Sequence, residues 1–271
     1  MADISVLEAR EARYREIISR FTLMSDAFMR TVFKDKRCTE HLLQVIMDDE
    51  SINVMEQTIQ KGYKNLQGRS AVLDCEAIDG SGRVFDVEIQ QEGEEASPKR
   101  ARYYSGLMDM NNLNAGDNFD LLPETYVIFI TSNDVLGHGE PIYHIEKQIK
   151  EVQCDFGDGA RIIYADASRR DGTKLGRLMH DLNCLHSKDM YSPILAERVR
   201  KFKETEKGVE YMCKELRELY NDGVAEGELE KAKKATIKLA AKKTPIPEIA
   251  DILEVSTEQV EVWLGLKKTV V

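Results

Sequence analysis

The stretch SAVLDCEAIDGSGRVFDVEIQQ, residues 70–91, gives the clearest structural signal in the chain. Its two halves, 70–78 and 83–91, are rich in strand-forming residues and alternate in polarity along much of their length. Between them lies Asp79-Gly80-Ser81-Gly82, which is typical of a tight turn. The stretch therefore predicts an antiparallel β-hairpin.

The length of the loop sets which residues of the hairpin face each other. A loop of residues 80–82 places Glu76 opposite Asp86. Two positions further from the turn it brings Asp74 opposite Glu88, with Cβ atoms about 5 Å apart. Acids gathered in this way repel each other unless a positive group lies between them, and carboxylates suit a hard ion such as Mg²⁺. The alternative is a solvated polar face, but the apolar segments on both sides of the hairpin favour a covered sheet.

Other parts of the core give weaker but usable patterns. Alternation predicts that Leu73 and Cys75 share one face of the first strand. The continuous apolar run TYVIFITS, residues 125–132, suits a central buried strand. A helix over residues 99–113 is expected to bury Tyr103, Leu107 and Met110.

The organisation of the chain is expected to follow four segments. These are an N-terminal helix (1–20), an α/β core (21–190), a long helix (191–222), and a lysine-rich helix with a tail like a helix-turn-helix (223–271). Asn221-Asp222-Gly223 is expected to interrupt the helices. In the tail, Ile249 and Ile252 are expected to pack against Val260, with Ser256 capping the last helix. This tail contacts either DNA or another protein, and it could join copies of the chain into a homo-oligomer.

Composition narrows the class of protein. A net charge of −10 argues against nonspecific coating of nucleic acid, although a local nuclease site remains compatible with it. The apolar runs are far shorter than the roughly 20 residues needed to cross a bilayer, and residues 1–17 lack a secretory pattern. The five cysteines include no C-x-x-C pair, which favours reduced thiols in the cytoplasm over a zinc site or disulfides. His180 and His186 are six residues apart and are expected to be ordinary packed or surface histidines.

Several motifs together resemble a known family. Asp74, a G-x-G turn, Glu88-Ile89-Gln90 and Arg102-Tyr103-Tyr104 resemble the PD-(D/E)XK nuclease-family transposases, also called recombination-promoting nucleases. Residues 26–33 are similar to the beginning of that family. Residues 246–264 are similar to its tail, so the resemblance covers residues 21–265.

The resemblance implies a fold and a chemistry. The fold would be α/β, with a restriction-endonuclease-like mixed sheet flanked by helices and an all-helical C-terminal extension. Asp74 and Glu88 would bind Mg²⁺ (or Mn²⁺), and with Gln90 would cleave DNA in recombination or transposition. The broader superfamily places lysine at the position of Gln90. Glutamine can only hydrogen-bond, so a nearby cation is expected to replace the lysine; the candidates are Arg69, Lys99, Arg100 and Arg102.

Three questions about function remain open. Lys99, Arg102 and Tyr104 are expected to contact DNA, although a packed helix with a solvated arginine would have the same sequence. Because Gln90 replaces lysine, the chain could also be a nuclease-fold module that binds DNA or protein without cutting. A third hypothesis is an interaction module that acts through the C-terminal helices.

Overall fold

The computed structural model describes residues 4–63, 69–91 and 96–267. The outermost residues of the expected N-terminal helix and of the tail, 1–3 and 268–271, lie outside the described residues. The chain forms two compact units, Met1–Cys213 and Lys214–Val271. Each is described separately below.

A six-stranded mixed sheet forms the centre of the first unit, in the order β1-β2-β3-β4-β8-β5. Strand β4 pairs in parallel with both β3 and β8, whereas the remaining neighbours are antiparallel. The strands are β1 (Val54–Tyr63), β2 (Ala71–Asp79), β3 (Val84–Gln90), β4 (Thr125–Thr131), β5 (Ile142–Ile145) and β8 (Ala160–Asp166), with a separate pair β6 (Gln148–Ile149) and β7 (Cys154–Asp155).

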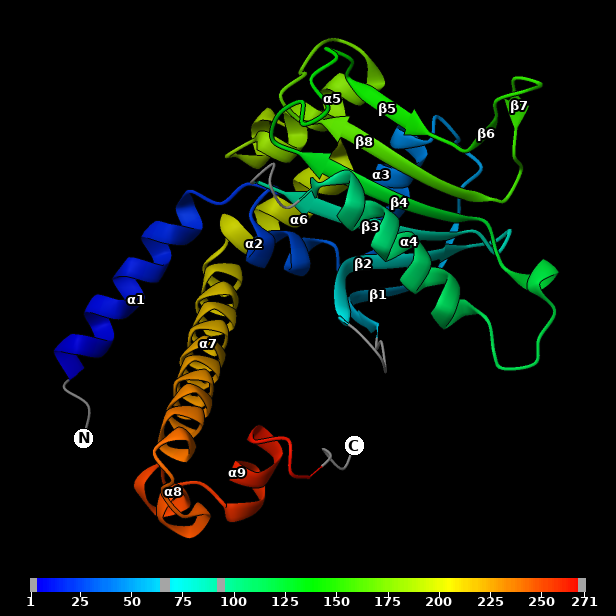
Figure 1. Cartoon of the computed structure of the whole chain (residues 1–271). Helices are drawn as coiled ribbons and strands as arrows, with labels where there is room; N and C mark the ends of the chain where they lie inside the picture. The colour runs from blue at the N-terminus through cyan, green and yellow to red at the C-terminus, as the bar shows by residue number, and fades with distance from the viewer. Residues whose placement is uncertain (1–3, 64–68, 92–95, 268–271) are drawn as a thin grey trace. The chain divides into compact units, whose positions relative to one another are not determined.

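Helices cover both faces of this sheet (Figure 1). Helix α4 lies across one face, where its Leu107 packs with Val127 and Phe129. Helix α3 lies against the other face, where Thr39 contacts the sulfur of Cys75 at 3.7 Å. The helices of this unit are α1 (Ile4–Ser19), α2 (Asp26–Val32), α3 (Lys36–Ile46), α4 (Pro98–Asn112), α5 (Lys174–Asn183) and α6 (Pro193–Lys203), with 3₁₀ turns η2 (Phe119–Leu121) and η3 (Ser187–Asp189).

Because both faces are covered, every residue of β3 and β4 is buried, as the apolar run 125–132 predicted. The predicted fold class is confirmed: a mixed α/β sheet is flanked by helices and followed by a helical extension. Polar residues of β3 are therefore enclosed in the core, where they need partners.

The predicted hairpin register is confirmed from the turn as far as Cys75 and Val87, whereas the predicted pair of Asp74 and Glu88 lies beyond the end of the ladder. Glu76 pairs with Asp86, and the backbone N–H of Asp79 donates to the carbonyl of Arg83 at 3.1 Å. The Asp79 carboxylate accepts the backbone N–H of Ser81 and of Arg83, and Gly82 takes a positive φ of 85° that favours glycine. The turn therefore holds the two strands in a single register.

Two predictions about side-chain direction are wrong. Leu73 packs with the cluster beneath α4, on the face opposite to Cys75. Opposite the stretch between Leu73 and Cys75, Gln60 of the neighbouring strand β1 adopts a positive φ of 58°. On α4, Tyr103 and Met110 are exposed, because the buried stripe is instead Ala101, Tyr104, Ser105, Leu107 and Met108.

The helices after the core also differ from expectation. The expected long helix 191–222 is divided at Glu204, and the second piece, α7 (Glu206–Ala241), runs without interruption through Gly223. One glycine costs a helix only about 1 kcal/mol. Stronger helix formers further along α7 on both sides, such as Leu216 and Glu228, offset the weak ones at 221–224.

The second unit is a small helical assembly. Helices α8 (Ile246–Ile252) and α9 (Thr257–Trp263) bury Ile249 and Val260 against each other. Ser256 caps α9 by accepting the backbone N–H of Gln259 at 3.1 Å, as predicted. The prediction for Ile252 is wrong, since its side chain is 54% exposed.

Candidate active site

The candidate site lies where β2 and β3 separate. Their ladder ends at the pair Cys75 and Val87. Beyond this point β3 continues beside β4 as far as Gln90, whereas β2 continues beside β1 as far as Ala71. The separation leaves an opening between the strands at the positions of Asp74 and Glu88.

Asp74 and Glu88 both reach into this opening. A Glu88 oxygen accepts the backbone N–H of Asp74 at 2.9 Å, and an Asp74 oxygen accepts the backbone N–H of Ile89 at 3.4 Å. Each carboxylate therefore lies against the backbone of the opposite strand. The two carboxylates replace the ladder hydrogen bonds that end at Cys75.

The acids at the opening are held in an unfavourable environment for negative charge. Burial, and then the charge of Asp74, raises the pKa of Glu88 to about 7. Burial, and then the charge of Asp26, raises the pKa of Asp74 to about 6. A positive group between the two carboxylates would lower both pKa values.

Asp86 adds a third buried acid. Its side chain is completely buried, and neither carboxylate oxygen has a hydrogen-bond partner within the described part of the chain. Burial, followed by the charges of Glu88 and Asp74, raises its pKa well above the usual range. Glu76, the fourth acid, is by contrast compensated: the hydroxyl of Tyr63 donates to it, and the ammonium of Lys61 lies 3.4 Å away. The uncompensated charge is thus concentrated around Asp74, Glu88 and Asp86. Such an all-oxygen donor set fits a hard divalent cation.

Two neighbouring side chains are directed at Oε2 of Glu88, the carboxylate oxygen that does not accept from Asp74. The carboxamide of Gln90 donates to it at 3.2 Å. The guanidinium of Arg100 donates to the same oxygen at 3.4 Å. Of the four cations that the sequence left as candidates for the missing lysine, Arg100 is the one that contacts Glu88 in the described part of the chain. It is held by Tyr104, whose hydroxyl accepts its Nε–H at 2.9 Å, and by the α4 N-cap Ser97, which accepts its backbone N–H.

Two hollows lie near the acids: Asp74 lines the first, and Arg100 lines both. The first has a volume of about 600 Å³, and its polar lining includes Asp74, Gln90 and Arg100 together with Asp26 and Arg30 of α2. Asp26 and Arg30 form an ion pair at 2.6 Å. Neither residue was singled out from the sequence, although the segment 26–33 carries part of the family resemblance and was the available signal.

The second hollow, about 700 Å³, has a basic lining of Arg69, Lys99, Arg100 and Arg102. Arg100 lines both hollows and is therefore shared by the acidic and the basic region. Lys99 and Arg102 are exposed on α4.

Tyr104 is placed differently from the other two residues expected to contact DNA. It is 7% exposed, and its ring stacks on Phe129 with centroids 6.3 Å apart. Tyr103, expected in the core, is exposed, and its hydroxyl donates to the Arg69 carbonyl. In this structure Tyr104 supports Arg100 from within the core.

Comparison with known families agrees with this geometry. The family described as PD-(D/E)XK nuclease family transposase matches residues 28–174, just over half of the chain. The chain belongs to this family. The same comparisons find no match among curated proteins or solved structures.

Membership of the PD-(D/E)XK nuclease-transposase family gives the protein a nuclease-like role. Such nucleases typically use divalent metals, and the family suggests DNA as the substrate. The matched range contains Asp74, Glu88, Gln90 and Arg100. Among the described residues, no helix combines the length and apolar character needed to cross a bilayer.

Proposed function

We propose that this chain is a metal-dependent endodeoxyribonuclease that uses Mg²⁺ (or Mn²⁺) and acts in recombination or transposition. The observation that carries the proposal is the group of buried acids at the opening of β2 and β3, which lacks sufficient positive charge and of which Asp74 lines an accessible hollow. The cytoplasm is the proposed compartment, because all five cysteines are free thiols.

Asp74 and Glu88 are the proposed metal ligands. A divalent ion held there would activate a water and offset the charge that develops on the phosphodiester in the transition state. Gln90, already donating to Glu88, keeps its amide oxygen as an acceptor that can orient the attacking water. Arg100 supplies the fixed positive charge that lysine provides elsewhere in the superfamily.

Cleavage of supercoiled plasmid tests the proposal. We expect nicked and linear products with Mg²⁺ or Mn²⁺ and intact plasmid in EDTA. The Glu56→Gln variant, which alters an exposed acid of β1, should cut as the parent does. Intact plasmid under every divalent ion tried would contradict the proposed activity.

The basic hollow is the proposed path of the DNA backbone. Lys99 and Arg102 are exposed there and would pair with phosphates, whereas Tyr104 would act on DNA indirectly by holding Arg100. We expect Lys99→Ala and Arg102→Ala each to weaken DNA binding similarly for all sequences, and to reduce the slope of log affinity against log salt by about 1. Fluorescence anisotropy at several salt concentrations measures both quantities. Unchanged slopes would place the DNA elsewhere.

The presence of Gln90 favours one alternative, a nuclease-fold module that binds DNA or protein without cutting. A glutamine cannot provide the charge of a lysine. DNA binding in the anisotropy assay without cleavage by any divalent ion would establish this alternative.

The helical extension is the proposed site of self-association. Exposed apolar side chains lie along α7, including Leu219, Val224, Leu229 and Ile237. A homo-oligomer would cover them and would bring two cleavage sites to one DNA.

A further inference from the structure

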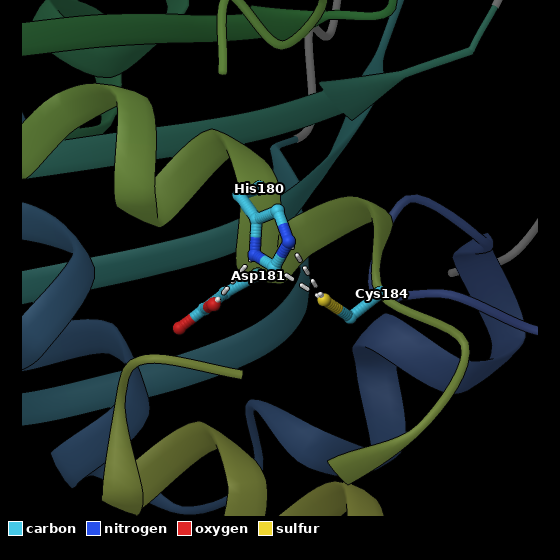
Figure 2. Close-up of side chains that lie close together, drawn as sticks. All are labelled: His180, Asp181 and Cys184. Carbon is cyan, nitrogen blue, oxygen red and sulfur yellow. Dashed lines mark hydrogen bonds and ion pairs between the residues drawn. The ribbon is translucent and has the colours of Figure 1, made fainter. Parts of the chain in front are cut away.

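We propose that His180, Asp181 and Cys184 form a second metal site, with Zn²⁺ as the preferred ion, at the end of α5. One donor atom from each side chain lies within 4.8 Å of the other two. Figure 2 shows the imidazole of His180 directed at both the Asp181 carboxylate and the Cys184 sulfur. None of these residues lines the two hollows of the nuclease site.

Both distances from the His180 nitrogen to the other two donors match those around a bound zinc ion. The Nδ1 of His180 lies 3.3 Å from a carboxylate oxygen of Asp181 and 3.4 Å from the sulfur of Cys184. Tetrahedral zinc with bonds of about 2.0–2.3 Å holds neighbouring donors roughly 3.3–3.8 Å apart. The side chains are therefore close to coordination geometry, and a water could take the fourth position.

Surrounding contacts orient the ligands in the manner of a metal site. Asp181 is 1% exposed at its side chain, and its two oxygens accept the backbone N–H groups of Tyr191 and Ser192 at 2.8 and 2.7 Å. These bonds fix the carboxylate while leaving each oxygen a second lone pair. The ring of Tyr191 also packs edge-on against His180.

The position on the helix favours a positive ion. Cys184 is the C-cap of α5, and His180 lies one turn earlier. Carbonyl groups at the carboxyl end of a helix carry partial negative charge, which attracts a cation. The sequence analysis considered only the spacing between histidines. It therefore missed the pair of His180 and Cys184, which are four residues apart.

The donor atoms of His180 and Cys184 favour a different ion from the one favoured at the nuclease site. Imidazole and thiolate ligands favour zinc, whereas the all-oxygen acids around Asp74 favour Mg²⁺ or Mn²⁺. A zinc ion would fix the Asp181 carboxylate, and through it the hydrogen bonds that Asp181 accepts from Tyr191 and Ser192 before α6. The site would thus stabilise the α5–α6 connection independently of cleavage.

Zinc titration against a chromophoric chelator tests this site in the full-length protein. We expect one tightly bound Zn²⁺ per chain, and a sulfur-to-metal charge-transfer band when Co²⁺ replaces zinc. His180→Ala and Cys184→Ser should each lower zinc affinity by more than about 100-fold, the upper range for changes around a metal site. They should also abolish the rise in melting temperature that zinc gives the parent.

Two control variants separate this site from other sources of binding. Cys154→Ser changes the exposed thiol of β7 and should bind zinc as the parent does. The Asp74→Asn, Glu88→Gln double variant should also retain the ion. Parental zinc affinity in His180→Ala, whose side chain is partly exposed, would overturn the proposal even if Cys184→Ser does not fold. Zinc lost only in the double variant, or no zinc bound by the parent, would overturn it as well.

Discussion

Replacing Glu88 with glutamine is expected to lower the rate of DNA cleavage by at least about 10²–10³-fold, the effect of removing one electrostatic stabiliser from an active site. Glutamine has nearly the same shape and retains an oxygen that can accept the backbone N–H of Asp74. It lacks the charge that would hold the cation. Asp74→Asn should have a similar effect for the same reason.

The same variants should fold with melting temperatures close to the parent's when no divalent ion is present, because the repulsion that a neutral amide removes offsets the contacts from Gln90 and Arg100 that the Glu88 variant loses. Glu88 is completely buried, and its pKa is raised to about 7 because burial and the charge of Asp74 disfavour its ionised form. A neutral amide removes that repulsion. Thermal unfolding in EDTA measures this effect beside plasmid cleavage in Mg²⁺, with Glu56→Gln as the matched control.

A loss of cleavage at a melting temperature close to the parent's would assign Glu88 to the chemistry rather than to folding. Parental cleavage rates for both Glu88→Gln and Asp74→Asn would show that the metal ligands are assigned wrongly.

Replacing Arg100 with alanine is expected to give the second-largest effect, a loss of about 10²-fold in cleavage. Arg100 donates to the same oxygen of Glu88 as Gln90 does, and it lines both hollows. Its removal deletes the fixed cation beside the acids. Arg100→Lys should restore part of the rate, because it returns the charge without the bond that the guanidinium makes to Tyr104.

The comparison with Arg102→Ala makes this prediction specific. Arg102 lies two residues further along α4, is exposed, and lines the basic hollow but not the hollow that contains Asp74. We expect Arg100→Ala to slow cleavage even at saturating DNA. The slower cleavage by Arg102→Ala should instead return to the parental rate when the DNA concentration is raised. Equal rates for the parent and Arg100→Ala at saturating DNA would remove Arg100 from the site.

The parts of the fold that local interactions determine could be predicted from the sequence. The turn around Asp79 determines its own hydrogen bonds, so the register of the hairpin and the pairing of Glu76 with Asp86 followed by counting. The buried strand 125–131 followed from its continuous apolar run.

The details that depend on the rest of the molecule could not be predicted. Leu73 and Cys75 lie on opposite faces of the sheet, and no turn residue signals this break in the alternation. The sheet covers one side of α4, and the sequence of the helix alone does not show which side. This choice decides whether Tyr103 or Tyr104 is buried. Likewise, Asp26 reaches the site only because α2 packs beside the opening.

The account depends most on a divalent cation binding between the acids where β2 and β3 separate. Anomalous diffraction from crystals soaked in Mn²⁺ locates such an ion directly. We predict a single strong peak at the nuclease site, within bonding distance of carboxylate oxygens of both Asp74 and Glu88, that disappears in Glu88→Gln. Manganese bound elsewhere with no peak between these two residues, or an unchanged peak in Glu88→Gln, would contradict the account.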